Sequence, residues 1–175
     1  SELPRFAMYP YIPSKEYDQQ QLNFLYHSGV QAVVLGHAPA TTFSYHSSHR
    51  HQANSFTIEL GKVKKFGENK AEDFIKINIM LRRLIGEKSL LLDDYDQRNF
   101  KIFEVHDMIT KNTDEFKLLF SEDLKNFTTF NSGTKLSEDL DSSYTTKHDD
   151  EAVLFPNANV AKGQRAAVII RPTSI

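Results

Sequence analysis

The sequence contains no cysteine among its 175 residues, which excludes disulfide bonds and thiolate metal ligands. Strong charge of one sign is missing as well, because 21 basic and 23 acidic side chains leave a formal net charge of -2. Such a chain has no field that would attract nucleic acid or an anionic membrane surface. We therefore expect neither a nucleic acid nor a membrane among its partners.

Long apolar runs are also absent. No stretch of about 18 apolar residues occurs, so we expect no membrane-spanning helix, and no signal-peptide pattern is visible. The sequence shows no phosphate-binding loop, Ser-His-Asp signature or dinucleotide fingerprint. These absences, with the lack of cysteine, favour a cytoplasmic protein. The seven histidines become the main candidates for metal ligation or proton transfer.

Residues 1–90 have the pattern of an α/β domain. Short apolar runs bounded by Gly and Pro alternate with segments of helical periodicity. The polar segment 37–52 lacks periodicity and is predicted to be a loop. The predicted elements are strands at 5–10, 30–36 and 53–61 and helices at 14–29 and 69–86.

Residues 91–175 have a different texture. Short runs rich in apolar and β-branched residues follow one another closely, separated by turn residues. The pattern predicts a small, mostly-β domain that resembles a barrel or a sandwich. Within it, KHDDE (147–151) is predicted to be an exposed turn between strands, and the isolated His106 carries no signal.

Glu59 stands inside a strand-like run. Its neighbours in SFTIELG (55–61) are mostly apolar or β-branched, so the pattern predicts a buried strand. Burial of a lone carboxylate is unfavourable unless the group is paired, hydrogen-bonded or neutralised. Glu59 is therefore either a general acid/base at a strand end beside a cleft, or a structural carboxylate paired with a nearby cation. The nearby cations are Arg50, Lys62 and Lys64.

The segment YHSSHRH (45–51) places three histidines within seven residues. Imidazole nitrogen is a good zinc ligand, but a loop fixes no ligand geometry, so a polar loop or a substrate contact is favoured over a metal site. Arg50 offers a charged fork suited to a carboxylate, and Tyr45 and His49 can donate hydrogen bonds. We therefore predict that Tyr45, His49 and Arg50 bind substrate.

The stretch SFTIELGKVKKFGENKAEDF (55–74) identifies a family. With TTFSYHSSH (41–49) before it and LRRLI (81–85) after it, it closely resembles succinylglutamate desuccinylases, in the aspartoacylase-like branch of the zinc carboxypeptidase fold. The pattern T-x-E-L-G-K followed by F-G-x-N is the most specific part. The resemblance covers essentially the whole chain and includes VHDMITKNTDEFKLLF (105–120) and HDDEAVLFPN (148–157).

This resemblance implies a zinc-dependent hydrolase that cleaves N-succinylglutamate to succinate and glutamate, the last step of a bacterial arginine-degradation route. By motif match, Glu59 would take a proton from a zinc-bound water and later protonate the leaving amine. Residues 1–90 would be the C-terminal part of the α/β catalytic domain, a partial zinc-carboxypeptidase-like sheet with helices. Residues 91–175 would be the mostly-β C-terminal domain.

The zinc-ligand motifs of the family, H-x-x-E and a later D-x-H, lie upstream of the matching residues. We therefore assign no metal ligand to this chain. His148 and Glu151 do have the H-x-x-E spacing, which we interpret as a chance match because it lies in the β-rich half. We expect a C-terminal portion of the enzyme that needs its N-terminal half, is inactive or nearly so alone, and exposes apolar surface through which it would self-associate.

Two alternatives remain open at this point. One is a related deacylase of the aspartoacylase type, with another N-acyl amino acid as substrate. The other is a non-catalytic binding or scaffold domain that reuses the fold. The presence of Glu59 argues against this second alternative.

Overall fold

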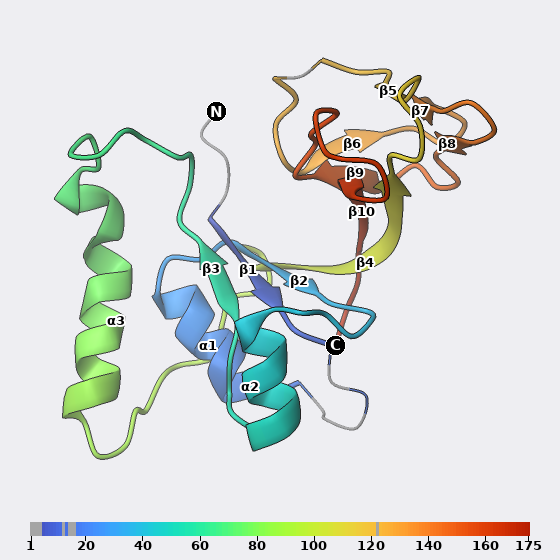
Figure 1. Cartoon of the computed structure of the whole chain (residues 1–175). Helices are drawn as coiled ribbons and strands as arrows, with labels where there is room; N and C mark the ends of the chain where they lie inside the picture. Colours follow the sequence, from blue (N-terminus) through green and yellow to red (C-terminus); the bar gives the residue numbers. More distant parts are fainter. Residues whose placement is uncertain (1–4, 12, 14–16, 122) are drawn as a thin grey trace. The chain divides into compact units, whose positions relative to one another are not determined.

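The computed structural model describes residues 5–11, 13, 17–121 and 123–175. They form two compact units (Figure 1), the first reaching to Ile102 and including Ile175, the second comprising Phe103–Ser174. The first unit mixes strands and helices, and the second is built from strands. The expected fold class, α/β followed by a small mostly-β region, is confirmed.

Three strands of the larger, seven-stranded sheet belong to the first unit, in the order β3-β1-β2. β1 (Phe6–Tyr9) and β2 (Ala32–Leu35) are parallel, with Phe6 opposite Ala32. Seven of their eight residues are buried, as expected where a parallel pair is covered on both faces. β3 (Thr57–Glu59) runs antiparallel along the other side of β1.

Helix α1 (Gln19–His27) connects the two parallel strands. Its N-cap is Asp18, whose carboxylate accepts the backbone N–H of Gln20 at 2.8 Å. Leu22 and Leu25 pack in the core with the strand residues. The expected start of this helix at residue 14 lies outside the described residues.

The predicted helix at 69–86 is confirmed. A 3-10 turn, η1 (Ala71–Phe74), leads into α3 (Ile75–Gly86). Ile77 and Met80 are buried and pack with Phe24 of α1. The remaining apolar side chains of α3 are exposed, namely Ile75, Ile79, Leu81, Leu84 and Ile85.

The predicted loop at 37–52 is wrong over its second half, because α2 (Phe43–His51) is a helix. Thr42 caps it, with its hydroxyl accepting the Tyr45 N–H at 3.2 Å. The last turn carries His49, Arg50 and His51, and basic groups there favour a helix through its dipole. Apolar periodicity failed as a signal because Ser48 is the only buried residue recorded for this helix.

The strands of the second unit pair antiparallel. Four of them, in the order β4-β10-β9-β6, belong to the seven-stranded sheet, and β5-β7-β8 form a separate three-stranded sheet. Ile109, Leu136, Val153 and Ile169 come from four different strands and pack in one core. The strands of this unit are β4 (Lys101–Thr110), of which Lys101 and Ile102 belong to the first unit, β5 (Lys117–Leu118), β6 (Thr128–Phe130), β7 (Lys135–Glu138), β8 (Ser143–Thr145), β9 (Glu151–Leu154) and β10 (Arg165–Pro172).

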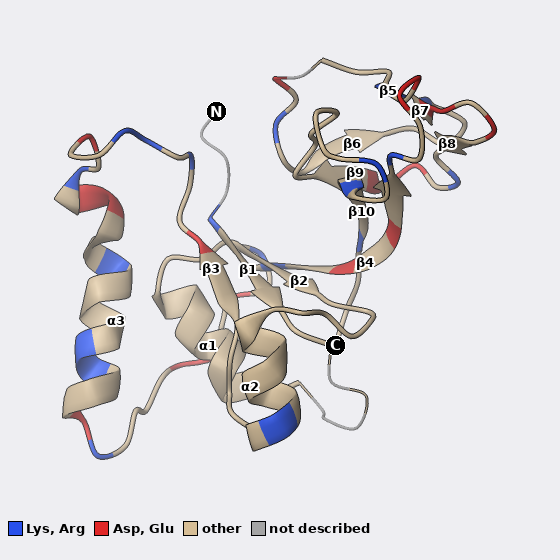
Figure 2. Cartoon of the chain, viewed as in Figure 1, with Lys and Arg blue, Asp and Glu red and all other residues tan. Residues whose placement is uncertain are grey.

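Acidic and basic residues are spread over both units (Figure 2), consistent with the near-neutral composition. Within the described residues, none of the helices has the length and apolar character needed to cross a bilayer.

Candidate functional site

Glu59 is the last residue of β3, an edge strand of the seven-stranded sheet, and lies opposite Phe6 of β1. Its side chain is half-buried, so the expectation of a buried carboxylate is wrong. Gly61, with φ +116°, follows two residues after the end of the strand. The strand therefore brings the carboxylate to the rim of the sheet rather than into the core.

The carboxylate of Glu59 makes no hydrogen bond or ion pair within the described part of the chain. Lys64, one of the expected structural partners, instead donates to Asp73 at 2.8 Å. Both oxygens of Glu59 are thus available to an incoming ligand. The alternative in which a neighbouring cation neutralises Glu59 is not what the structure shows.

Helix α2 carries the other expected site residues. Tyr45 and His49 lie one turn apart, and their rings stack with centroids 5.3 Å apart and an interplanar angle of 10°. Arg50 is exposed, and no ion pair or hydrogen bond involves its guanidinium among the residues described. The structure thus brings Tyr45 and His49 together, while no described contact joins them or Arg50 to Glu59.

Serine hydroxyls attach α2 to the segment that leads into β3. Ser55 donates to the carbonyl of Ser44 at 2.6 Å, and the hydroxyls of Ser48 and Ser55 lie 2.6 Å apart. Ser48 also donates to the carbonyl of Ala53 at 3.1 Å. These bonds hold the helix with Tyr45 against the chain that continues into Glu59.

Two family models match the chain, one after the other. The model of the succinylglutamate desuccinylase/aspartoacylase catalytic domain covers residues 1–85, and that of the AstE/AspA barrel-sandwich hybrid domain covers residues 90–173. The chain belongs to the succinylglutamate desuccinylase/aspartoacylase family.

Individual relatives agree with this family assignment. The chain is 41% identical over 175 residues to a succinylglutamate desuccinylase of Pseudoalteromonas atlantica, and 42% identical over 174 residues to one of Shewanella woodyi. These alignments cover 100% and 99% of the chain and 50% of each relative. The chain therefore spans about half the length of these desuccinylases.

Solved structures of the family share the fold. The crystal structure of a succinylglutamate desuccinylase from Vibrio cholerae matches with a TM-score of 0.86 at 31% identity. The match covers 98% of this chain and 50% of that one.

The family resemblance implies a zinc ion, which needs several ligand side chains close together. Among the described residues, one group of three potential ligands lies close enough to hold an ion, and it is His106, His148 and Glu151 in the second unit. No such group includes Glu59. The residues around Glu59 therefore do not fit a zinc site of their own.

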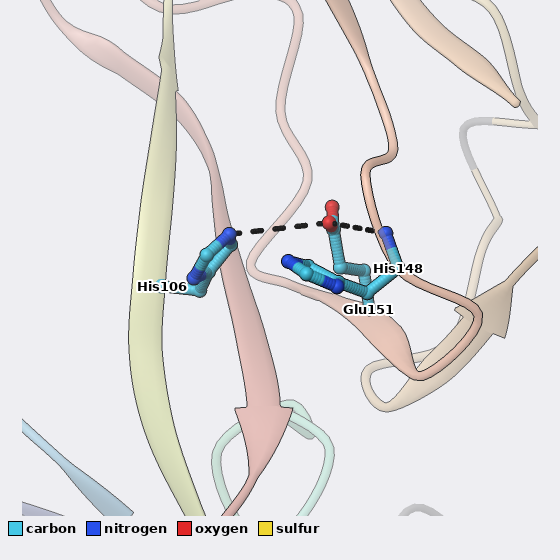
Figure 3. A group of neighbouring side chains, drawn as sticks. All are labelled: His106, His148 and Glu151. Carbon is cyan, nitrogen blue, oxygen red and sulfur yellow. Dashed lines mark hydrogen bonds and ion pairs between the residues drawn. The ribbon is translucent and has the colours of Figure 1, made fainter. Parts of the chain in front are cut away.

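The group of His106, His148 and Glu151 was missed by the sequence analysis (Figure 3). Glu151 is fully buried, so the expectation that 147–151 is an exposed turn is wrong for its last residue. Its Oε1 accepts the backbone N–H groups of Lys147 at 2.7 Å and His148 at 3.0 Å. The H-x-x-E spacing was the one visible signal, and it marks a carboxylate that closes its own turn.

Tyr144 also contacts the carboxylate of Glu151. Its hydroxyl donates to Oε2 of Glu151 at 2.7 Å. Burial, and then the bond to the carboxylate, raise the pKa of Tyr144 far above its ordinary value. The phenol therefore stays protonated and acts as a donor throughout the physiological range.

Proposed function

We propose that this chain is part of a zinc-dependent amidohydrolase that cleaves N-succinylglutamate to succinate and glutamate in the cytoplasm, as a step of arginine catabolism. The desuccinylases of P. atlantica and S. woodyi, each matched over nearly the whole chain, support the substrate. The observation that carries the proposal is the half-buried carboxylate of Glu59 at the end of an edge strand, which has no bonded partner among the residues that the structure describes.

Glu59 acts as the general base and then as the general acid. It takes a proton from the attacking water while the water oxygen bonds to the amide carbon of the succinyl group. It then gives that proton to the amide nitrogen as the C–N bond breaks, which releases glutamate with a free amine and leaves succinate. A carboxylate without a competing cation is suited to both transfers.

Tyr45, His49 and Arg50 would bind the substrate, which carries several carboxylates. The exposed guanidinium of Arg50 can pair with one of them in a two-pronged geometry. The stacked pair of Tyr45 and His49 offers two further donors on one face of α2. The serine bonds described above would keep this face in place.

The zinc would be held by the part of the enzyme outside this chain, where the resemblance puts its ligands. Bound zinc polarises a carbonyl and lowers the pKa of water. In this division of labour, residues 1–90 supply Glu59 and the substrate contacts as the C-terminal part of the catalytic domain. Residues 91–175 form the second, mostly-β domain.

The chain alone would then be inactive or nearly so, and the remaining half of the enzyme would be its natural partner. The exposed apolar side chains of α3 support such a partner, since Ile85 is 86% exposed and Leu84 53%. In isolation the same surface would lead the chain to self-associate.

The experiment is the substitution Glu59→Gln in the full-length enzyme. The variant keeps the shape of the side chain but removes the base, so kcat should fall by about 10²–10⁴-fold with little change in KM. Glu72→Gln, at an exposed position of η1, is the matched control and should leave kcat unchanged. Unaltered activity of Glu59→Gln would show that Glu59 is not the base.

Two further assays test the rest of the proposal. Hydrolysis of N-succinylglutamate should exceed that of N-acetylated amino acids, and the reverse order would identify a deacylase of another specificity. The 175-residue chain with added zinc should show almost no turnover next to the full-length enzyme. Substantial turnover by the chain would overturn the assignment of zinc to the missing half.

A further inference from the structure

We propose that the second unit contains a binding site for one divalent transition-metal ion, formed by His106, His148 and Glu151. The ligand atoms come from β4, from the turn between β8 and β9, and from the first residue of β9. All three lie within 4.8 Å of one another. Figure 3 shows both imidazole rings directed toward the space beside the carboxylate.

His106 has a ring nitrogen that could bind a metal ion. Its Nε2 is buried and has no hydrogen-bond partner among the described residues. The nearest acceptor, Oε1 of Glu151, is 3.9 Å away, which is too far for a hydrogen bond. A buried nitrogen without a partner is unfavourable, and an ion between the two residues would satisfy it.

The backbone of β4 explains why His106 points here. Ile169 of β10 pairs with Asp107 and Ile170 pairs with Val105, so the register shifts at His106 and leaves it without a pairing residue. Shifts of this kind redirect one side chain and are frequent beside functional sites. The register shift therefore directs the imidazole of His106 toward Glu151, which the regular alternation of side chains along a strand would not do.

Glu151 keeps capacity for one more ligand. A carboxylate has about four acceptor positions. Three are used, two on Oε1 by Lys147 and His148 and one on Oε2 by Tyr144. The remaining position on Oε2 can bind a cation, and the three hydrogen bonds hold the carboxylate still while it does so.

The neighbouring charges leave room for a cation. Asp150 is paired with Arg171 at 2.9 Å, and Asp107 with Lys147 at 3.5 Å. The charges within each of these two ion pairs cancel. The negative charge of Glu151 is therefore left to neutralise part of the charge of a bound ion.

The geometry requires a small contraction on binding. Two bonds of a tetrahedral zinc ion hold their ligand atoms about 3.3–3.6 Å apart, compared with the 4.8 Å within which the three ligand atoms lie here. His148 is exposed, so its ring can rotate to close the site and also gives the ion a path from solvent. Three protein ligands leave a fourth position for water.

Two imidazoles and one carboxylate select the kind of metal. Zn²⁺ and its neighbours in the transition series bind this set well, whereas Mg²⁺ and Ca²⁺ require mostly oxygen. Bound there, the ion would clip the turn between β8 and β9 to the middle of β4. Its role would be to stabilise the second unit.

The test is titration of the metal-free 175-residue chain with Zn²⁺ alone, followed by calorimetry. One Zn²⁺ should bind per chain at micromolar concentration. His148→Ala removes an exposed ligand and should fold, yet its affinity should fall by more than about 100-fold, since even groups that merely support a ligand change affinity 10–100-fold. His106→Ala should behave in the same way, and Mg²⁺ should not bind to the unaltered chain.

The control is the double variant His46→Ala/His51→Ala on α2, whose rings lie 5.6 Å apart and offer a competing place for zinc. It should keep the affinity of the unaltered chain. Zn²⁺ should also raise the melting temperature of the unaltered chain but not that of His148→Ala. Absence of saturable binding, or binding that survives His148→Ala and is lost with the α2 histidines, would overturn the proposal.

Discussion

Glu59 and Glu151 each occupy the end of a short strand, but their surroundings differ completely. Glu59 ends β3, is half-buried and has no bonded partner in the described residues. Glu151 begins β9, is fully buried and accepts three hydrogen bonds. A carboxylate satisfied by its own turn maintains structure, whereas one without such bonds at a sheet edge is open to a ligand. Partners, more than burial, separate the two roles.

The largest effect on stability should come from Glu151→Gln. The glutamine amide has one acceptor oxygen in place of two, and its NH₂ group would face one of the three groups that donate to Glu151. The free energy of unfolding should therefore fall by about 3 kcal/mol. Urea unfolding of the chain would measure it. Glu59→Gln is the matched control and should change stability by less than about 0.5 kcal/mol. Equal losses in the two variants would remove the distinction drawn between these residues.

Tyr144→Phe should have the next largest effect. The variant deletes the donor to Oε2 of Glu151 while keeping the ring in place, and it should lower the free energy of unfolding by about 1.5 kcal/mol. Combined with Glu151→Gln, its effect should shrink, because both changes remove the same bond. Additive losses in this double-mutant cycle would show that the two side chains act independently.

Arg50→Lys tests the unpartnered side of the comparison. Lysine keeps the charge but loses the two-pronged geometry, so KM for N-succinylglutamate should rise about tenfold in the full-length enzyme while kcat changes little. Lys62→Arg, just beyond β3, serves as the control. A loss confined to kcat would place Arg50 in the chemical step instead of substrate binding.

Asp96 supplies a third environment, a partly buried carboxylate paired with a cation. Its hydrogen bond to the Arg98 side chain, first among several, lowers the pKa of Asp96 to about 2. A depressed pKa stabilises the fold above the ordinary value and loses that contribution as the pH falls toward the folded value. At pH 5 the unaltered chain should therefore be slightly more stable than Asp96→Asn. This difference should disappear as the pH falls toward 2. A difference independent of pH would exclude this linkage.

The two-part architecture could be predicted because its periodicities are local. Buried runs such as 32–35 report their own burial, and so does Ile77 on the predicted apolar face of the helix at 69–86. Leu81 and Leu84, expected on the same face, are exposed. Helix α2 could not be predicted, since caps and serine hydroxyls stabilise it in place of an apolar face. The environment of Glu151 could not be predicted either, because its hydrogen-bond donors come into place only when the turn has folded.

The site divides in the same way. Glu59 was predicted from a family pattern together with its position in a strand. The convergence of His106 on Glu151 depends on a register shift between β4 and β10, which no spacing in the sequence encodes. Long-range pairing therefore decides what local pattern cannot.

Helix α2 has a consequence for the dynamics of substrate binding. With Ser48 as its recorded buried residue, it has few apolar contacts to resist local opening, so its amides should exchange with solvent well before those of β1 and β2. A substrate held by Tyr45, His49 and Arg50 would have to order this helix, and part of its binding energy would be used in doing so. Slower hydrogen exchange across residues 43–51 would then report occupancy of the site, even in a variant that cannot turn over.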